Sequence, residues 1–126
     1  MSLLVDEATL DAIRAERARR DAAAHALGVA LAEYELAKND LRKVDESMTL
    51  DERYLRLGAV QHEFEGYKDS GMKVIARSLA MEKRIADGAL AAFGLPQEGR
   101  TFTIDQKTGD VLELVAGAYV PVEDAP

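Results

Sequence analysis

Apolar residues recur at helical spacing along most of this chain, in two long stripes that a short break separates. The first stripe covers residues 10–48 and the second covers residues 50–93. At the break, Thr49 is followed three residues later by Glu52, which is the capping-box pattern of a helix N-terminus. Two amphipathic helices of similar length around one break favour a long antiparallel helical hairpin of the coiled-coil or bundle type.

The residues between the apolar positions support this prediction. Ala, Leu, Glu and Arg dominate the first stripe, and these residues lose little on entering a helix. We predict helices over about residues 6–46 and 50–93, within a helical region of residues 1–96. Gly94 and Pro96 give the second helix a clear end. Because the break contains neither glycine nor proline, one continuous helix roughly 130 Å long stays open as an alternative.

Two arginines interrupt the first stripe. Arg17 and Arg20 stand where apolar residues are expected. In a hairpin that turns near Ser47, Arg17 lies within about one helical turn of Glu82. Arg17, Arg20 and Glu82 are therefore candidates for a polar layer, or Arg17 and Arg20 for an anion site, that fixes the register of the helices. The interpretation favoured for the two arginines is that the helices splay here and both side chains lie over apolar surface.

The second stripe has its weak point at two glycines. Gly66 and Gly71 bracket a segment of poor helix formers, so we predict a kink there, and Asp69 and Ser70 are candidate N-caps for a new helix if the helix breaks. The hairpin pairing places this segment near Gly28. Close packing of the helices is favoured over a hinge at this point.

After the second helix the apolar period changes from that of a helix to that of a strand. Residues 101–105 and 110–115 alternate, and Gly109 stands in the turn between them. This pattern predicts a small β-hairpin in a C-terminal region of residues 97–126, with residues 119–120 as a candidate third strand. Four apolar residues are predicted to share one face and to dock on the helices or on another subunit: Phe102, Ile104, Leu112 and Leu114.

Composition narrows the classes of function. The 126 residues are 48% apolar and 31% charged, which is typical of one folded domain. Sixteen basic and 23 acidic residues give a net charge of −7, which opposes binding to nucleic acid or to an anionic membrane. The N-terminal residues lack the basic region of a signal peptide, and no stretch reaches the ~20 apolar residues of a transmembrane helix. A cytoplasmic or virion-associated protein is expected.

No residue pattern predicts catalysis, a cofactor or a metal site. The chain contains no cysteine, and neither His25 nor His62 has a glutamate three residues before it, as carboxylate-bridged metal sites in helical bundles require. Acidic pairs such as Asp51-Glu52 fit solvated helix faces. Phosphate-binding and nucleophile motifs are absent from the sequence. We expect a protein that is not an enzyme.

Two paired helices leave apolar flanks uncovered. The residues predicted to contact a partner are Tyr54, Tyr67 and Met81 on the helices, with Phe102, Ile104, Leu112 and Leu114 on the β-hairpin. We predict a structural or assembly protein that forms a homodimer or homotrimer through its helices and contacts another protein through the β-hairpin. A small bacteriophage virion component fits this outline.

A chaperone or adaptor that clasps a client protein is the alternative function. The layout loosely resembles prefoldin-type coiled coils, in which the β-hairpins lie between the helices, whereas here the β-hairpin follows both. An accessory subunit of an enzyme complex is a third interpretation.

Overall fold

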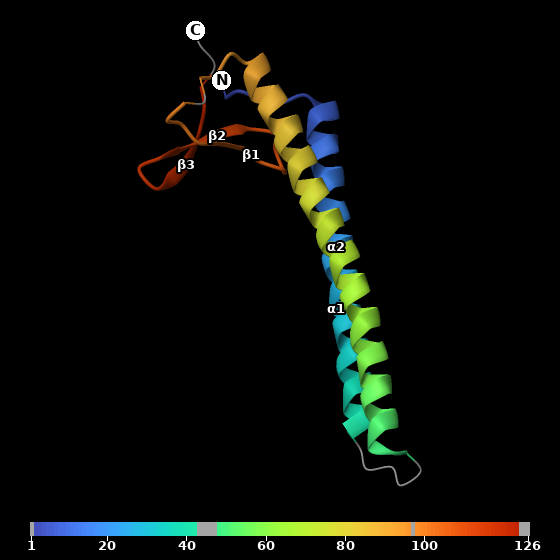
Figure 1. Ribbon diagram of the computed structural model, residues 1–126. Coiled ribbons are helices and arrows are strands. Elements are labelled where there is room, and N and C mark those ends of the chain that lie inside the picture. Colours follow the sequence, from blue (N-terminus) through green and yellow to red (C-terminus); the bar gives the residue numbers. More distant parts are fainter. Residues whose placement is uncertain (1, 43–47, 97, 124–126) are drawn as a thin grey trace. The chain divides into compact units, whose positions relative to one another are not determined.

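The computed structural model of the protein describes residues 2–42, 48–96 and 98–123. Two long helices pack against each other and are followed by a three-stranded antiparallel sheet, as the sequence predicts (Figure 1). The elements of this part of the chain are α1 (Glu7–Arg42), α2 (Leu50–Ala92), β1 (Phe102–Ile104), β2 (Val111–Val115) and β3 (Ala118–Pro121). The predicted end of the first helix near residue 46 and the turn at Ser47 lie outside the described residues.

The chain divides into two compact units. We call Met1–Ala18 with Ser78–Pro126 the terminal unit, and Arg19–Arg77 the hairpin unit. The boundary predicted between residues 96 and 97 follows secondary structure, whereas these units follow packing. Each unit contains part of α1 and part of α2.

The terminal unit has a hydrophobic core to which both helices and the sheet contribute. Ile13 of α1 and Val111 of β2 are fully enclosed, with 1% and 0% of their surface exposed. The buried cluster consists of Val5, Leu10, Ile13, Leu90, Ile104 and Val111. At about 1.5–3 kcal/mol for each fully buried aliphatic side chain, this cluster supplies much of the stability of the unit.

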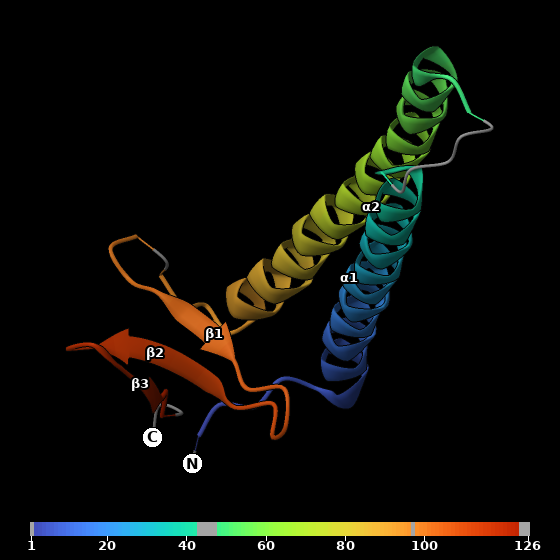
Figure 2. The ribbon, with the colours of Figure 1, turned by 90° about the horizontal axis from the view of Figure 1, so that it is seen from below.

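The N-terminal segment before α1 pairs with the sheet, which the sequence does not reveal. The Leu3 N–H donates to the Val122 carbonyl at 2.8 Å, and the Leu3 carbonyl accepts from the Val111 N–H at 2.9 Å. The Val5 N–H donates to the Gly109 carbonyl at 3.0 Å. These bonds hold the N-terminal segment beside the sheet, close to the C-terminal strand (Figure 2).

Helix α1 begins with an N-cap at Asp6. The Thr9 N–H donates to Asp6 Oδ1 at 2.8 Å, three residues along the chain. Hydrogen bonds from the side chain and the main chain of Thr9 hold the pKa of Asp6 below its usual value, because they favour the charged carboxylate. At the start of α2, the Glu52 N–H donates to Thr49 Oγ1 at 3.2 Å, which confirms the predicted cap.

The strands run in the order β1, β2, β3, and the predicted third strand is confirmed (Figure 2). The turn between β2 and β3 is Ala116-Gly117, and both residues have positive φ, 53° and 84°. Two consecutive positive φ angles are the mark of the type I′ turn, whose twist matches that of antiparallel strands. Glycine meets this requirement without strain, whereas Ala116 adopts a conformation that alanine rarely takes.

The predicted shared face of the β-hairpin is wrong. Ile104 pairs with Val111, and Thr103 pairs with Leu112. Because side chains alternate along a strand, Ile104 and Phe102 share the core face with Val111, while Leu112 and Leu114 point to the opposite face. The core face of β2 therefore starts at Val111, one residue earlier than predicted.

The hairpin unit contains the C-terminal part of α1 and the N-terminal part of α2, which run antiparallel. The Tyr34 and Phe64 rings stack with their centroids 4.8 Å apart and their planes 15° from parallel. Lys38 Nζ lies 5.2 Å from the Tyr34 ring centroid. This pairing rules out the alternative of one continuous helix.

Close packing at one glycine is confirmed in the hairpin unit. A Cβ on Gly71 would lie 2.8 Å from Leu27 Cγ, so only glycine fits this helix contact without a shift of its neighbour. At Gly28 and Gly66, by contrast, a Cβ would meet nothing within 4 Å. Helix α2 runs unbroken through this segment, so the renewed helix with a cap at Asp69 or Ser70 is wrong.

Candidate interaction surfaces

The predicted pairing of Arg17 with Glu82 is present in the terminal unit. Arg17 Nε lies 2.8 Å from Glu82 Oε1, and both side chains are partly buried. Arg20, the third residue of the predicted polar layer, belongs to the hairpin unit and is half-buried on α1. The ion pair joins α1 to α2. That Arg17, Arg20 and Glu82 together fix the register of the helices stays a prediction.

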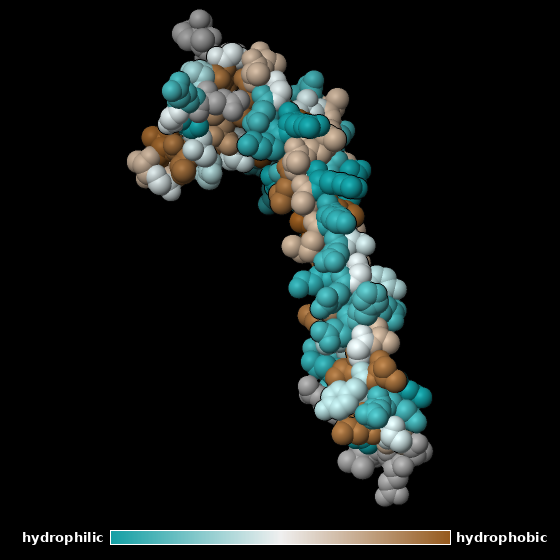
Figure 3. Space-filling view, in the orientation of Figure 1, coloured by the Kyte–Doolittle hydropathy of each residue, from teal (hydrophilic) through white to brown (hydrophobic). Residues whose placement is uncertain are grey.

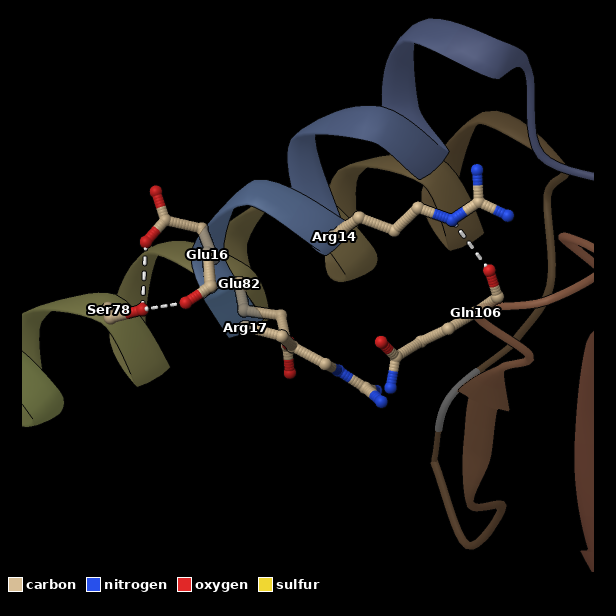
Figure 4. A network of polar contacts seen from close by, with 6 residues as sticks. All are labelled: Arg14, Glu16, Arg17, Ser78, Glu82 and Gln106. Atoms are coloured by element: carbon tan, nitrogen blue, oxygen red, sulfur yellow. Dashed lines mark hydrogen bonds and ion pairs between the residues drawn. The ribbon is translucent and has the colours of Figure 1, made fainter. Parts of the chain in front are cut away.

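A second polar contact lies beside this ion pair and was missed. Ser78 and Glu16 are both buried, and Ser78 Oγ lies 2.8 Å from both the main-chain oxygen and Oε2 of Glu16 (Figure 4). The single hydroxyl proton is therefore shared between two acceptors. Ser78 stands seven residues before Ile85, so the heptad spacing of α2 was a signal that this serine faces α1.

The loop between β1 and β2 joins the same network. Arg14 Nε donates to the Gln106 main-chain oxygen at 2.8 Å, and Arg14 Nη2 donates to the Lys107 oxygen at 3.2 Å. The side-chain amide of Gln106 lies against the Arg17 guanidinium. Figure 4 shows these side chains reaching from α1 toward the loop. The network ties helix and sheet together in the terminal unit.

The sheet carries its own polar clasp. Arg100 donates two hydrogen bonds to the Glu113 carboxylate, from Nε at 2.7 Å and from Nη2 at 2.8 Å. The Arg100 guanidinium also lies 4.7 Å from the Phe102 ring centroid. The hydrogen bonds from Arg100 lower the pKa of Glu113, and the same bonds raise the pKa of Arg100.

The predicted partner-contacting residues of the sheet fall on two faces. Ile104 is buried in the core and offers no surface to a partner, and Phe102 is half-buried beside it. On the opposite face, Leu112 is half-buried, Leu114 is 41% exposed and its cross-strand neighbour Tyr119 is 50% exposed. We call Leu112, Leu114 and Tyr119 the outer sheet face. Tyr119 was placed in a candidate strand by the sequence, but not among the contact residues.

The predicted contact residues of the helices all lie at the surface. Tyr54 and Tyr67 of the hairpin unit and Met81 of the terminal unit are each exposed by more than a third. Hydrophobic side chains are scattered among polar ones along the visible face of the helices (Figure 3). All three side chains are therefore accessible to solvent.

Two grooves run along the hairpin unit. The first, of about 420 Å³, is lined mainly by small residues that include Ala26, Ser70 and Gly71. The second, of about 170 Å³, contains the stacked Tyr34 and Phe64. Tyr67 lines both grooves. Both hollows are open and largely apolar.

The described residues show no group of three or more His, Asp or Glu side chains that could hold a metal ion. Within the same residues, no helix is both long enough and apolar enough to cross a membrane.

No protein family model, curated protein or solved structure matches the chain.

Proposed function

We propose that this chain is a non-enzymatic structural or assembly protein. It associates with further copies of itself through the hairpin unit, and it contacts another protein through the outer sheet face. The observation that carries the proposal is the lack of a buried core in the hairpin unit. None of its described residues is fully buried. Two long helices without an enclosed side chain lack the core that normally stabilises helices of this kind.

The uncovered surface of the hairpin unit includes many large apolar side chains. Tyr67 is 57% exposed, and exposed aliphatic residues lie on both helices: Val29, Leu31, Leu36, Leu50, Leu55, Met72 and Val74. Each apolar side chain that becomes fully covered contributes about 1.5–3 kcal/mol. A second copy of the same hairpin supplies a surface of matching composition, and symmetry lets each copy cover the other.

The charge distribution favours the hairpin unit as the contact between identical chains. Residues 19–77 contain 10 basic and 11 acidic side chains, whereas the terminal unit contains 6 basic and 12 acidic side chains. Two nearly neutral surfaces approach without net repulsion, but two surfaces of charge −6 repel each other. The terminal unit is therefore better suited to contact a different protein.

The outer sheet face supports a contact with a different protein. Leu112, Leu114 and Tyr119 form an apolar surface on the side of the sheet that faces away from the core. A sheet that is apolar on both faces needs a cover for the second one.

Sedimentation velocity over a range of micromolar concentrations tests the self-association. We expect the full chain to form an oligomer, and Tyr54→Asp combined with Tyr67→Asp to shift it toward the monomer while the helical circular dichroism signal is kept. The matched control is Leu114→Asp with Tyr119→Asp, which places the same charges on the outer sheet face and leaves the oligomer intact. A wild-type monomer at every concentration would overturn the proposal.

The second candidate function is a chaperone or adaptor, and the aromatic groove of the hairpin unit is the observation that favours it. Tyr34, Phe64 and Tyr67 line an open hollow that could hold an apolar client segment. This function requires a stable monomer that suppresses the aggregation of an unfolded protein. The two functions therefore give opposite results in the same size measurement.

A further inference from the structure

The two grooves of the hairpin unit lie on one face. On α1, Ala26 lines the first groove, and Glu33, seven residues later, lines the second. On α2, Ser70 lines the first groove, and Glu63, seven residues earlier, lines the second. Residues seven apart lie on the same side of a helix, two turns from each other. The grooves therefore form one continuous surface, which we call the groove face.

The stretches of helix that flank the two grooves differ in charge, being basic at the level of the first groove and acidic at the level of the second. Residues 19–25 and 68–77 contain five basic and two acidic side chains, while residues 29–38 and 59–67 contain four acidic and one basic. Leu27 packs against Gly71, so residues 19–25 and 68–77 lie at a similar level along the hairpin. Tyr34 stacks on Phe64, so residues 29–38 and 59–67 lie at a similar level as well. The charges are thus separated along the helix axis.

The charges that border the groove face are arranged symmetrically. Ala26 is midway between Arg19 and Glu33 on α1, with seven residues on each side. Ser70 is midway between Glu63 and Arg77 on α2 in the same way, and the four charged side chains are all exposed. A rotation of 180° about an axis through the level of Ala26 and Ser70 therefore exchanges the basic and acidic ends.

We infer that the groove face binds the groove face of a second copy of this chain in the antiparallel direction, with a two-fold axis at the level of Ala26 and Ser70. This inference rests on the proposed self-association and specifies its geometry. In this arrangement Arg19 faces Glu33 of the second copy, and Glu63 faces Arg77 of the second copy. Symmetry repeats both encounters, so four pairs of opposite charge lie across the interface.

Electrostatics selects the antiparallel pairing over the parallel one. Two parallel copies place each basic end opposite a basic end, and each acidic end opposite an acidic end, which is repulsive at both. Sterics agree with the choice of axis. Ala26, Ser70 and Gly71 are small, so a second helix can approach closely at that level, and Tyr67 and Val74 lie nearby to be covered.

A full charge reversal tests the orientation. The reversed variant combines Arg19→Glu, Arg77→Glu, Glu33→Arg and Glu63→Arg, so that it keeps the composition of the groove face and exchanges its ends. The antiparallel arrangement predicts that the reversed variant pairs with itself as wild type does, because every opposite pair is restored. When ¹⁵N-labelled wild type is mixed with the reversed variant, native mass spectrometry then finds mixed dimers below the share expected for random exchange.

A partial reversal measures the strength of the charge pairing. Arg19→Glu with Arg77→Glu makes both ends acidic and replaces four attractive encounters by four repulsive ones. We expect the dimer dissociation constant to rise at least about tenfold, and the increase to shrink at high salt. Unchanged affinity would contradict the antiparallel arrangement, since the parallel one is repulsive both before and after the change.

Disulfide crosslinking gives a readout that does not depend on charge reversal. Because the sequence contains no cysteine, any disulfide forms between the introduced residues. In the antiparallel dimer, Ala26→Cys lies near its symmetry mate and crosslinks. Glu33→Cys lies about 20 Å from its own mate along the axis, too far for a disulfide. Three results would overturn the inference but not the proposed self-association. These are an excess of mixed dimers of wild type with the reversed variant, a disulfide between Glu33→Cys residues, and a trimer. A monomeric wild type would overturn both.

Discussion

The two units of this protein use the same pair of helices in different ways. In the terminal unit the helix ends and the sheet enclose six apolar side chains, and polar residues bridge the helices beside that core. In the hairpin unit the helices meet along one line, and no described residue is fully buried. The comparison teaches that helix propensity and helical spacing alone do not make a core. A third layer has to cover the paired helices, and within the described residues only the terminal unit contains one.

The largest effect is expected from a truncation in the core of the terminal unit. Ile13→Ala removes a side chain that is 1% exposed and leaves a cavity, so the free energy of unfolding should fall by about 2–5 kcal/mol. Leu55→Ala is the matched truncation in the hairpin unit, where the side chain is 75% exposed. At concentrations that keep the protein monomeric, it should change the free energy by less than about 0.5 kcal/mol. Urea unfolding measures both, and similar losses would erase the contrast between the units.

A smaller effect is expected at the helix contact of the hairpin unit. Gly71→Ala forces a Cβ to within 2.8 Å of Leu27, and the resulting overpacking should cost about 1–3 kcal/mol. Gly66→Ala on the same helix meets no neighbour within 4 Å and should stabilise the protein by up to about 1 kcal/mol. Thermal unfolding of the two variants gives shifts of opposite sign. Shifts of the same sign would show that the helices do not approach at Gly71.

Sequence reasoning succeeded in the helices and was weaker in the sheet. The spacing of apolar residues located both helices, and the hairpin geometry placed Arg17 beside Glu82, because an α-helix has a fixed rise per residue. Strand pairing has no such constraint. Val111, Leu112, Leu114 and Val115 put apolar side chains on both faces of β2, so alternation alone could not decide which face is buried.

Main-chain hydrogen bonds of the loop before β2 and of the N-terminal segment accompany the choice of which face of β2 is buried. In that loop the Gly109 N–H donates to the Asp105 carbonyl and the Asp105 N–H donates to the Asp110 carbonyl, which places Val111 opposite Ile104. Residues 2–5 bond to the sheet through main-chain groups, and such bonds leave no side-chain pattern to recognise. The parts of the fold that depend on main-chain pairing were therefore the parts that the sequence concealed.

The polar clasp of the sheet should make the terminal unit sensitive to acid. The folded pKa of Glu113 is lowered by its hydrogen bonds with Arg100, so the stabilisation is complete above the unfolded pKa and is lost as the pH falls through the folded value. Glu113→Gln removes the charge, and its difference in stability from wild type should be seen at neutral pH and disappear in acid. Unfolding followed at several pH values tests this. A difference that persists at low pH would mean that packing rather than charge is responsible.

The smallest effect is expected at the N-cap of α1. Asp6→Asn keeps a side-chain oxygen that accepts from the Thr9 N–H and removes only the charge, which interacts favourably with the helix N-terminus. Because the folded pKa of Asp6 is lowered, the charge stabilises the helix above the unfolded pKa, and this contribution vanishes as the pH falls through the folded value. The matched change in the hairpin unit is Asp51→Asn, in the first turn of α2. NMR titration of the Asp6 carboxylate in wild type checks the cap: Asp6 should titrate below its ordinary range, and a normal pKa there would show that the cap does not form in solution.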